Sequence, residues 1–588
     1  MMQLSKLLAL DVIDFYPLPR EQHLLVNQRT LQRGIISNHL LPLLNLCSYF
    51  RNLEEHCELI TGNLANPEES GTAVTSLLKD LQQAGIMVTA DQWLQRIENN
   101  QQNTRPDPEP TWILAISTCD RPRLLQRLLD SAIAYITTTT LPAKALLLDD
   151  SRQADNQTSN QRAWASWLKH CSLTGEYWDR TARVNLCNRL CRKFAHHDAQ
   201  TIRWLLSPEY VDERVNTSGQ NRNLALLLSS GQRLLMLDDD CILTPLKHTP
   251  HNSQFQVGRL PVQAIPFHNQ SDLVYAMEKV DINPFESHLH HLGTTFKQTL
   301  KRLRSDQNLT WLRTLDPATR KRLDASEPIT RVTLNATCGD PGTASMDWLY
   351  TRPADCSTKI AEYLQKIPEH TVAERLFWRG RFQTVLTYDE TLMTTTLTGL
   401  DNRALLPCVI PFGRGEDRML GNGLRVLEPQ ALFFIDNWAL PHEPEPVRYW
   451  QRPSSTNENL LPDPEHFLII STEQQVALDI DDPMTRLAYL ANRYLHLANL
   501  SDSSLIIELN RRYTKSKTMV LQDYAENQIT VTDHATHLQR DLALLVEQTT
   551  QEIAQPLEFD RDWLTRFRQL AHHYGQALLI WPTLCIKS

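Results

Sequence analysis

The chain has 588 residues, 41% hydrophobic and 22% charged, which is typical of a globular protein with roughly three to five structural units. Its formal net charge of −9 argues against broad electrostatic binding to nucleic acid. No window holds the ~18 uncharged apolar residues of a membrane span, and no signal-peptide pattern opens the chain. Because the eleven scattered cysteines are most simply reduced thiols, we expect a cytoplasmic protein, with peripheral association at an inner membrane face left open.

Residues 1–108 are predicted to form a helical N-terminal region. Segments 72–86 and 89–103 repeat apolar residues at spacings of three and four, the spacing of one helix face. The following segment, 99–110, is polar and contains three prolines, so it is the best candidate for a linker.

Three apolar runs in the next segment, 109–445, are predicted to be buried strands. They cover 112–116, 144–151 and 233–240, and helical patterns separate them. Continuous apolar strands alternating with helices predict an α/β core with a Rossmann-like, mostly parallel sheet. In such sheets ligands bind at the carboxyl ends of the strands, where these runs carry acidic residues.

The remainder of the chain divides less clearly. An insertion is expected at about 246–400, because the acidic motifs on either side of it are far apart. Beyond a proline-rich break, residues 446–588 return to helical patterns and are predicted to form a mainly helical C-terminal region.

The third run ends in Asp238, Asp239 and Asp240. Carboxylates clustered at a strand end repel one another, and a divalent cation would remove that conflict. Because side chains alternate along an extended chain, we expect Asp238 and Asp240 to share a ligand and Asp239 to point away. A solvated loop at a strand end is the alternative that the three letters alone leave open.

The order of several motifs resembles that of the family-2-like nucleotide-sugar glycosyltransferases, which have the GT-A fold. The resemblance covers residues 111–245 and rests on pieces in a fixed order, namely "STCDRP" at 117–122, Asp149-Asp150-Ser151, "GQNRN" at 219–223, Ser230-Gly231 and Asp238-Asp239-Asp240. It implies transfer of a sugar from a nucleoside-diphosphate donor of the UDP or GDP type. The acceptor would be the hydroxyl of a glycan, a lipid-linked glycan or a protein.

The resemblance also implies roles for individual residues. Nucleotide-sugar binding falls to Thr118, Asp120, Arg121, Asp149, Asp150, Arg222, Asp238 and Asp239. A Mn²⁺ or Mg²⁺ ion would be held by Asp238 and Asp240, and His442 is the candidate third ligand. A histidine in a proline-rich loop is also often a plain surface residue.

Farther along, "GRGEDRMLG" resembles the family segment whose aspartate deprotonates the acceptor. This makes Asp417 the candidate general base, with Glu416 beside it, and one base with direct displacement implies inversion at the sugar carbon. Acidic residues at a helix N-terminus, favoured by the helix dipole, are the alternative explanation.

Other interpretations stay open at this stage. A non-catalytic scaffold that binds a nucleotide sugar or a protein is one, and a haloacid-dehalogenase-like phosphatase built on the D-x-D pattern is another. A zinc site at Cys187 and Cys191 is a weaker possibility, and His288, His290 and His291 are expected to be a surface cluster and not a metal site. The glycine-rich loop at 339–342 is expected to be a turn, and the oligomeric state, a homo-oligomer included, is open.

Overall fold

The computed structural model of this chain is described here for residues 4–64, 67–99, 111–136, 141–194, 196–210, 216–249, 254–305, 309–325, 327–343, 345–351, 359–360, 362–364, 372–388, 396–451, 461–473, 480–531 and 536–587. The predicted linker at 99–110 lies outside these residues except for Asn99, which ends a helix. Of the helices within these ranges, none combines the length and hydropathy that crossing a bilayer demands.

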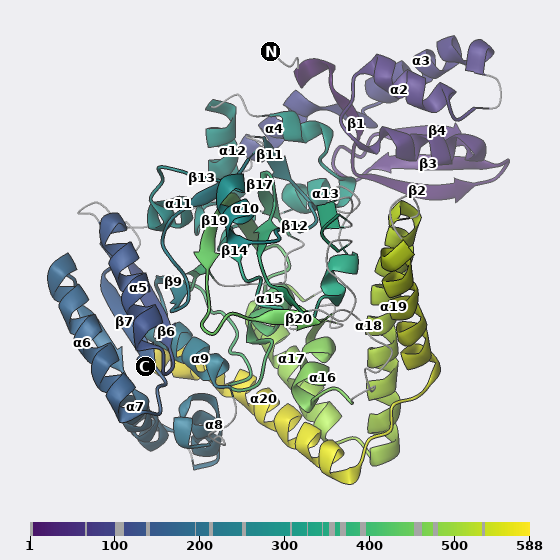
Figure 1. The fold of residues 1–588 in the computed structure, drawn as a ribbon. Helices are drawn as coiled ribbons and strands as arrows, with labels where there is room; N and C mark the ends of the chain where they lie inside the picture. The colour runs from purple at the N-terminus through teal and green to yellow at the C-terminus, as the bar shows by residue number, and fades with distance from the viewer. Residues whose placement is uncertain are drawn as a thin grey trace.

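A mixed sheet of 13 strands forms the centre of the molecule, with helices on both of its faces (Figure 1). Its main path runs β11-β17-β19-β14-β18-β9-β6-β7-β8. The strands are β6 (Trp112–Thr118), β7 (Lys144–Asp149), β8 (Gly175–Trp178), β9 (Arg233–Asp238), β10 (Leu246–His248), β11 (Phe255–Val257), β12 (Gln263–Pro266), β13 (Met277–Lys279), β14 (Thr330–Gly339), β16 (Phe377–Gly380), β17 (Thr384–Thr387), β18 (Leu397–Asp401) and β19 (Leu432–His442).

The predicted α/β fold is therefore confirmed. Strands β8, β7, β6 and β9 are parallel neighbours, whereas β18 is antiparallel to β9 and β14. The chain moves outward from β6 through β7 to β8 and then returns to place β9 on the other side of β6. Strand order thus reverses between β6 and β9, and a crevice for ligands opens at such a reversal.

Two hydrophobic cores sandwich the parallel strands, because alternate residues of each strand point to opposite faces. From β6, Ile113 and Ala115 pack on one face, and Leu114 and Ile116 pack on the other. The second face is covered by α5 (Pro122–Ala132), α6 (Ala154–Cys171) and α11 (Pro284–His291). The first is covered by α7 (Arg180–Lys193), α8 (His196–Leu206), α9 (Ser218–Leu228) and α15 (Glu416–Leu427).

The C-terminal region is mainly helical, as predicted, and it packs directly on this first face. Its helices are α16 (Pro464–Glu473), α17 (Pro483–Ala498), α18 (Asp502–Val531), α19 (Thr536–Ala554) and α20 (Arg561–Lys587), and β20 (Tyr449–Gln451) pairs with β15 (Val372–Glu374). Trp581 of α20 is fully buried, and its indole N–H donates to the carbonyl of Leu406 at 2.7 Å. The region therefore shares one core with the sheet.

The segment expected as an insertion mostly joins the same sheet. Strands β10 to β17 lie within 246–400, and β18 ends at its boundary. Of these strands, β11, β17, β14 and β18 belong to the main path of the 13-stranded sheet. The accompanying helices are α10 (Gln270–Ala276), α12 (Phe296–Ser305) and α13 (Pro317–Ala325).

The N-terminal region contains strands in addition to the helices predicted for it. An antiparallel sheet of β2 (Ile13–Leu18), β3 (Gln22–Asn27) and β4 (Arg33–Ser37) lies beside a pair formed by β1 (Leu8–Leu10) and β5 (Met87–Thr89). The helices are α1 (Leu41–Asn45), α2 (Leu53–Thr61), α3 (Pro67–Gln83) and α4 (Ala90–Asn99). Trp93 of α4 packs against Trp311 of the 246–400 segment, with 6.3 Å between the ring centroids. This contact joins the N-terminal region to the rest of the molecule.

Candidate functional site

The carboxyl ends of β6, β7 and β9 bring the predicted acidic residues to one edge of the sheet. Ser117 pairs with Asp238 of β9, and Thr118 pairs with Asp149 of β7. This edge is where the strand order reverses, and it is the edge at which the sequence predicted a ligand site.

Asp239 and Asp240 form one cluster with residues of the loop after β6. The Thr118 hydroxyl donates to Asp239 at 2.7 Å, and the Arg121 guanidinium lies 3.2 Å from Asp239 and 3.3 Å from Asp240. Burial, reinforced by the charge of Asp240, raises the pKa of Asp239 to about 7. Arg121 is 43% exposed at its side chain, so it closes the cluster on the solvent side.

The expectation that Asp239 points away is therefore wrong. Strand β9 ends at Asp238 and the chain turns at the next two residues, so the alternation of an extended strand stops there. Asp239 and Asp240 meet at Arg121, and Asp238 remains on the strand.

His442, at the end of β19, contacts Asp240 with 3.1 Å between its Nε2 and the carboxylate. Its Nδ1 lies 2.5 Å from the carbonyl oxygen of Asp340, a group that only accepts, so Nδ1 carries a proton. Burial opposes the charge, but Asp240 raises the pKa of His442 to about 9. In turn, despite burial, His442 lowers the pKa of Asp240 to about 2.

The glycine-rich segment 339–342, which was expected to be a turn, ends β14 at Gly339 and continues as irregular chain that supports the site. The Asp340 carboxylate accepts from the Gly342 backbone N–H and from Arg448, each at 2.7 Å. Gly339 has a φ of 106°, and a Cβ there would lie 2.5 Å from the backbone oxygen of His442. Only glycine allows β14 and β19 to approach this closely at His442.

A second cluster adjoins the first at Asp238. Arg222 of α9 donates a hydrogen bond to Asp417, which lies in the first turn of α15. Burial, together with the charges of Glu416 and Asp238, raises the pKa of Asp417 to about 7 although Arg222 opposes the shift. The Arg222 guanidinium is buried, and its Nε and Nη1 have no hydrogen-bond partner among the described residues.

Asp120 connects the loops after β6 and β7. Its carboxylate accepts from the backbone N–H groups of Arg152 and Gln153 and from the Asn156 side chain at 3.0–3.1 Å. Although partial burial opposes ionisation, these hydrogen bonds lower the pKa of Asp120. In this conformation Asp120 therefore holds the start of α6, and its role in nucleotide binding stays a prediction.

Asp149 and Asp150 are buried and also internally bonded. Asp149 accepts from Ser151, Asn160 and Tyr177, the last at 2.6 Å. The role in binding a nucleotide base that the resemblance implied for one of these two residues stays a prediction.

Asp150 carries a network that sequence reasoning missed. Its carboxylate accepts from Arg180 at 2.9 Å and from Arg183 and Thr217. Arg183 also donates to Asn221 at 2.9 Å, one residue before Arg222, so the network fixes the start of α9. The available signal was the pair of arginines on α7, at 180 and 183, which lie three residues apart and so share a helix face.

The acidic cluster has donor atoms that a divalent cation accepts, but their arrangement does not hold one. Asp239 and Asp240 meet at Arg121, and His442 contacts Asp240. Carboxylates and an imidazole are donor types that Mn²⁺ or Mg²⁺ accepts only if the imidazole is neutral. Here Arg121 lies against both carboxylates, and no group of three or more such residues within the described ranges is arranged to hold a metal. As arranged, these residues do not fit a cation, and one would bind only after Arg121 moves.

The weaker sequence hypotheses find no support. Cys187 is buried among hydrophobic residues, and within the described ranges neither Cys187 nor Cys191 belongs to a group of three or more possible metal ligands. The 288–291 histidines are not a surface cluster, because His288 is fully buried against Thr333 and His291 stacks on Phe434.

No family model and no curated protein matches the chain. Among solved structures, residues 1–349 of S. aureus TarS align with 11% identity over 76% of this chain and 94% of that one, at a TM-score of 0.27. A longer TarS structure aligns with 10% identity over 75% and 54%, at 0.26. The mannosyltransferase PcManGT from Pyrobaculum calidifontis, in complex with GDP-Man and Mn²⁺, aligns with 10% identity over 83% and 93%, at 0.23. Scores this low carry no argument about the chain.

Proposed function

We propose that the protein is a glycosyltransferase that moves a sugar from a nucleoside diphosphate to an acceptor hydroxyl. The observation that carries the proposal is the meeting of two clusters at the carboxyl end of β9. One holds Arg121 against Asp239 and Asp240, and the other holds Arg222 against Asp417. The first cluster offers charged groups that can bind a nucleotide-sugar donor, and the second offers a base that can deprotonate an acceptor hydroxyl.

The donor side needs positive charge, because departure of a nucleoside diphosphate leaves negative charge on its terminal phosphate. Arg121 and Arg222 supply guanidinium groups on the two sides of the β9 end, and charge-assisted bonds to phosphate are strong. The unpartnered Nε and Nη1 of Arg222 are available to donate to a phosphate without breaking its bond to Asp417.

The acceptor side needs an unprotonated base within hydrogen-bond reach of the attacking hydroxyl. With a pKa of about 7, Asp417 has a proton affinity suited to that task near neutral pH. A single base and direct displacement would invert the configuration of the sugar carbon. Glu416, adjacent in the same helical turn, adds negative charge that favours a proton on Asp417.

Dependence on Mn²⁺ or Mg²⁺ remains part of the proposal in a specific form. A cation would compete with Arg121 for Asp239 and Asp240, and His442 would have to give up its Nε2 proton to act as a ligand. The steps above are derived from the chain's own residues and do not pass through a metal.

Binding of a nucleotide sugar without transfer is the second candidate. It is favoured by the ion pair of Arg222 with Asp417, which occupies the candidate base. A binding protein would keep this pair closed, whereas an enzyme must free one Asp417 oxygen for the acceptor.

The test uses a panel of UDP- and GDP-sugars with and without Mn²⁺, read by thermal shift, donor hydrolysis and transfer. A ligand at a hundredfold excess over its Kd stabilises the protein by about 2.7 kcal/mol, so a donor that binds is detectable. Asp417→Asn is expected to lose transfer and to keep the thermal shift caused by the donor. Asp155→Asn, at an exposed position of α6, is expected to change neither. Transfer that survives Asp417→Asn would refute the assignment, and phosphate release from simple monoesters would support a phosphatase.

A further inference from the structure

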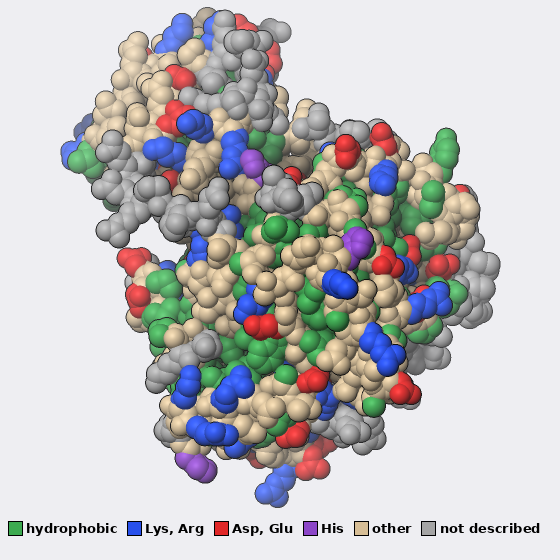
Figure 2. All heavy atoms as spheres, turned by 90° about the vertical axis from the view of Figure 1, so that its left-hand side faces the viewer, with side chains coloured by type: hydrophobic (Ala, Val, Ile, Leu, Met, Phe, Trp, Pro, Cys, Tyr) green, Lys and Arg blue, Asp and Glu red, His purple; other side chains and the backbone are tan. Residues whose placement is uncertain are grey.

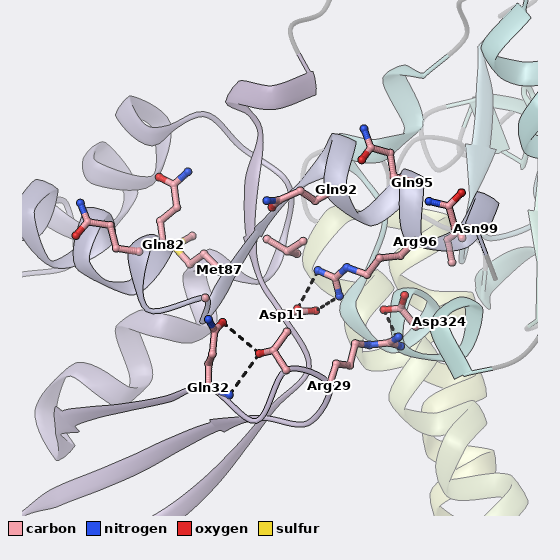
Figure 3. A pocket seen from close by; sticks show the side chains of 15 residues that line it. Asp11, Arg29, Gln32, Gln82, Met87, Gln92, Gln95, Arg96, Asn99 and Asp324 are labelled. Atoms are coloured by element: carbon pink, nitrogen blue, oxygen red, sulfur yellow. Dashed lines mark hydrogen bonds and ion pairs between the residues drawn. The ribbon is translucent and has the colours of Figure 1, made fainter.

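A cavity of about 1080 Å³ lies between the N-terminal region and α13, apart from the acidic strand ends (Figure 3). In Figure 1 the N-terminal region stands at the upper right, whereas α5 and β6 lie at the lower left. The cavity lies at the upper end of the size range of small-molecule sites. It therefore has room for a ligand of its own.

Side-chain amides dominate the lining of this cavity. Six of them come from the turn before β4, the end of α3 and the exposed side of α4, namely Gln32, Gln82, Gln83, Gln92, Gln95 and Asn99. Figure 3 shows Gln92, Gln95 and Asn99 in a row along α4. An amide both donates and accepts hydrogen bonds, as does a hydroxyl group, so such a lining suits a polyhydroxyl ligand.

The charges in the cavity are paired. Arg96 contacts the Asp11 carboxylate at 3.0 and 3.3 Å, and Arg29 lies 3.4 Å from Asp324. Figure 3 shows both pairs facing the cavity. Because each guanidinium that lines the cavity already has a carboxylate, the lining is balanced in charge. A phosphate or another anion would meet Asp11 and Asp324 without a surplus of positive charge.

Asp324 forms the floor beneath Arg29. Its side chain is 1% exposed, and apart from the ion pair with Arg29 its two oxygens have no hydrogen-bond partner at normal distance and angle among the described residues. Burial raises the pKa of Asp324, opposed by Arg29 and by the indole of Trp93. A buried carboxylate with unused acceptor sites is stabilised when ligand hydroxyl groups donate hydrogen bonds to it. Arginine, which covers this carboxylate, has a long side chain.

We propose that this cavity binds a neutral saccharide, such as a remote part of a glycan acceptor. The proposal rests on the proposed function for the identity of that glycan, but binding itself requires no transfer. The amide lining, the balanced charge and the buried carboxylate of Asp324 together select hydroxyl groups over phosphate, sulfate or nucleotide. The position apart from the strand ends suits a second contact with a long glycan, which would raise affinity by linking two sites.

The test measures binding of neutral maltohexaose and xylohexaose to the full chain by calorimetry, in the absence of any donor. Peptides from α4 are expected to gain protection from hydrogen exchange when saccharide binds. Asp324→Asn is expected to weaken binding at least tenfold, and Lys321→Gln, on the same helix but exposed and outside the cavity, is the matched control. The double variant Gln83→Leu and Gln95→Leu changes two exposed lining residues and guards against a folding defect of the buried variant.

Several outcomes would overturn the inference. These are absence of binding to both neutral hexasaccharides, equal binding to the wild type and to both cavity variants, or protection confined to segments that do not line the cavity. Preference for a chitosan hexamer would point to an amine ligand of Asp324, and preference for a heparin hexasaccharide to an anion site. Failure here with a retained nucleotide-sugar shift would leave the proposed function standing, and the reverse result would leave the cavity standing.

Discussion

Replacing Asp239 with asparagine should stabilise the protein, and increasingly so as the pH rises. Folding raises the pKa of this carboxyl from its ordinary 3.8 to about 7, because Asp239 is buried beside Asp240. An acid whose pKa is raised on folding costs stability when it ionises. That cost begins as the pH passes the unfolded value and is complete above the folded value.

The magnitude follows from the two pKa values. One pKa unit corresponds to ~1.4 kcal/mol, so the cost is about 2 kcal/mol at pH 5 and about 4 kcal/mol at pH 8. Asparagine removes the charge, keeps an oxygen that can accept from Thr118, and leaves Arg121 paired with Asp240. The advantage of the variant in free energy of unfolding should therefore grow by about 2 kcal/mol between these pH values.

Urea unfolding at pH 5, 6, 7 and 8 in EDTA measures this gap, with Asp155→Asn as an exposed control that should show none. A gap that stays constant, or narrows as the pH rises, would refute the argument that burial of ionised Asp239 is costly.

Three further changes test other contacts of the site. Arg121→Gln should bind Mn²⁺ at least tenfold more tightly than the wild type in calorimetry, and an unchanged affinity would mean that Arg121 does not compete with a cation. The His442 pKa of about 9 means that its pairing with Asp240 stabilises fully below pH 6.5 and is lost as the pH rises through 9. His442→Gln should therefore lower the melting temperature at pH 6 and lower it less at pH 10, and a loss independent of pH would contradict this. Gly339→Ala should destabilise the protein by more than Gly342→Ala, since both have positive φ but only the first Cβ meets backbone, and equal melting temperatures would disprove that clash.

The parallel half of the sheet could be predicted because each buried strand is a continuous apolar run. The runs at 112–116, 144–151 and 233–240 became β6, β7 and β9, and their ends meet at one edge. The rule that ligands bind at such ends then brought the acidic residues together without any knowledge of distances.

The N-terminal strands could not be predicted in the same way because their turns lack the usual signal. Hairpins typically have glycine or asparagine where φ is positive. In this chain, Arg20 and Glu21 adopt φ values of 64° and 52° between β2 and β3, and Leu31 adopts 57° before β4. Nothing in the local sequence indicates these turns, so the region was predicted from its helices alone.

Side-chain roles at the site were harder to predict because a short turn decides them. The motif of three aspartates was treated as an extended strand, but the chain leaves the strand after Asp238. Likewise Asp120 and Asp149 have the residue type that a nucleotide pocket requires, yet backbone and side-chain donors of neighbouring loops take up their carboxylates. The type and order of the residues predict where the site lies, whereas contacts between loops decide which role each residue has.

The contacts of the individual residues also explain how several acids coexist at one edge of the sheet. Asp239 and Asp240 share Arg121, Asp240 adds the imidazolium of His442, and Asp417 is held by Arg222. The chain thus supplies its own cations to a cluster that a divalent ion could otherwise neutralise. A bound diphosphate would compete with these carboxylates for Arg121, and its arrival would free Asp239 and Asp240 for a cation. On this reasoning donor and metal should bind cooperatively, and Arg121 is the group through which each affects the other.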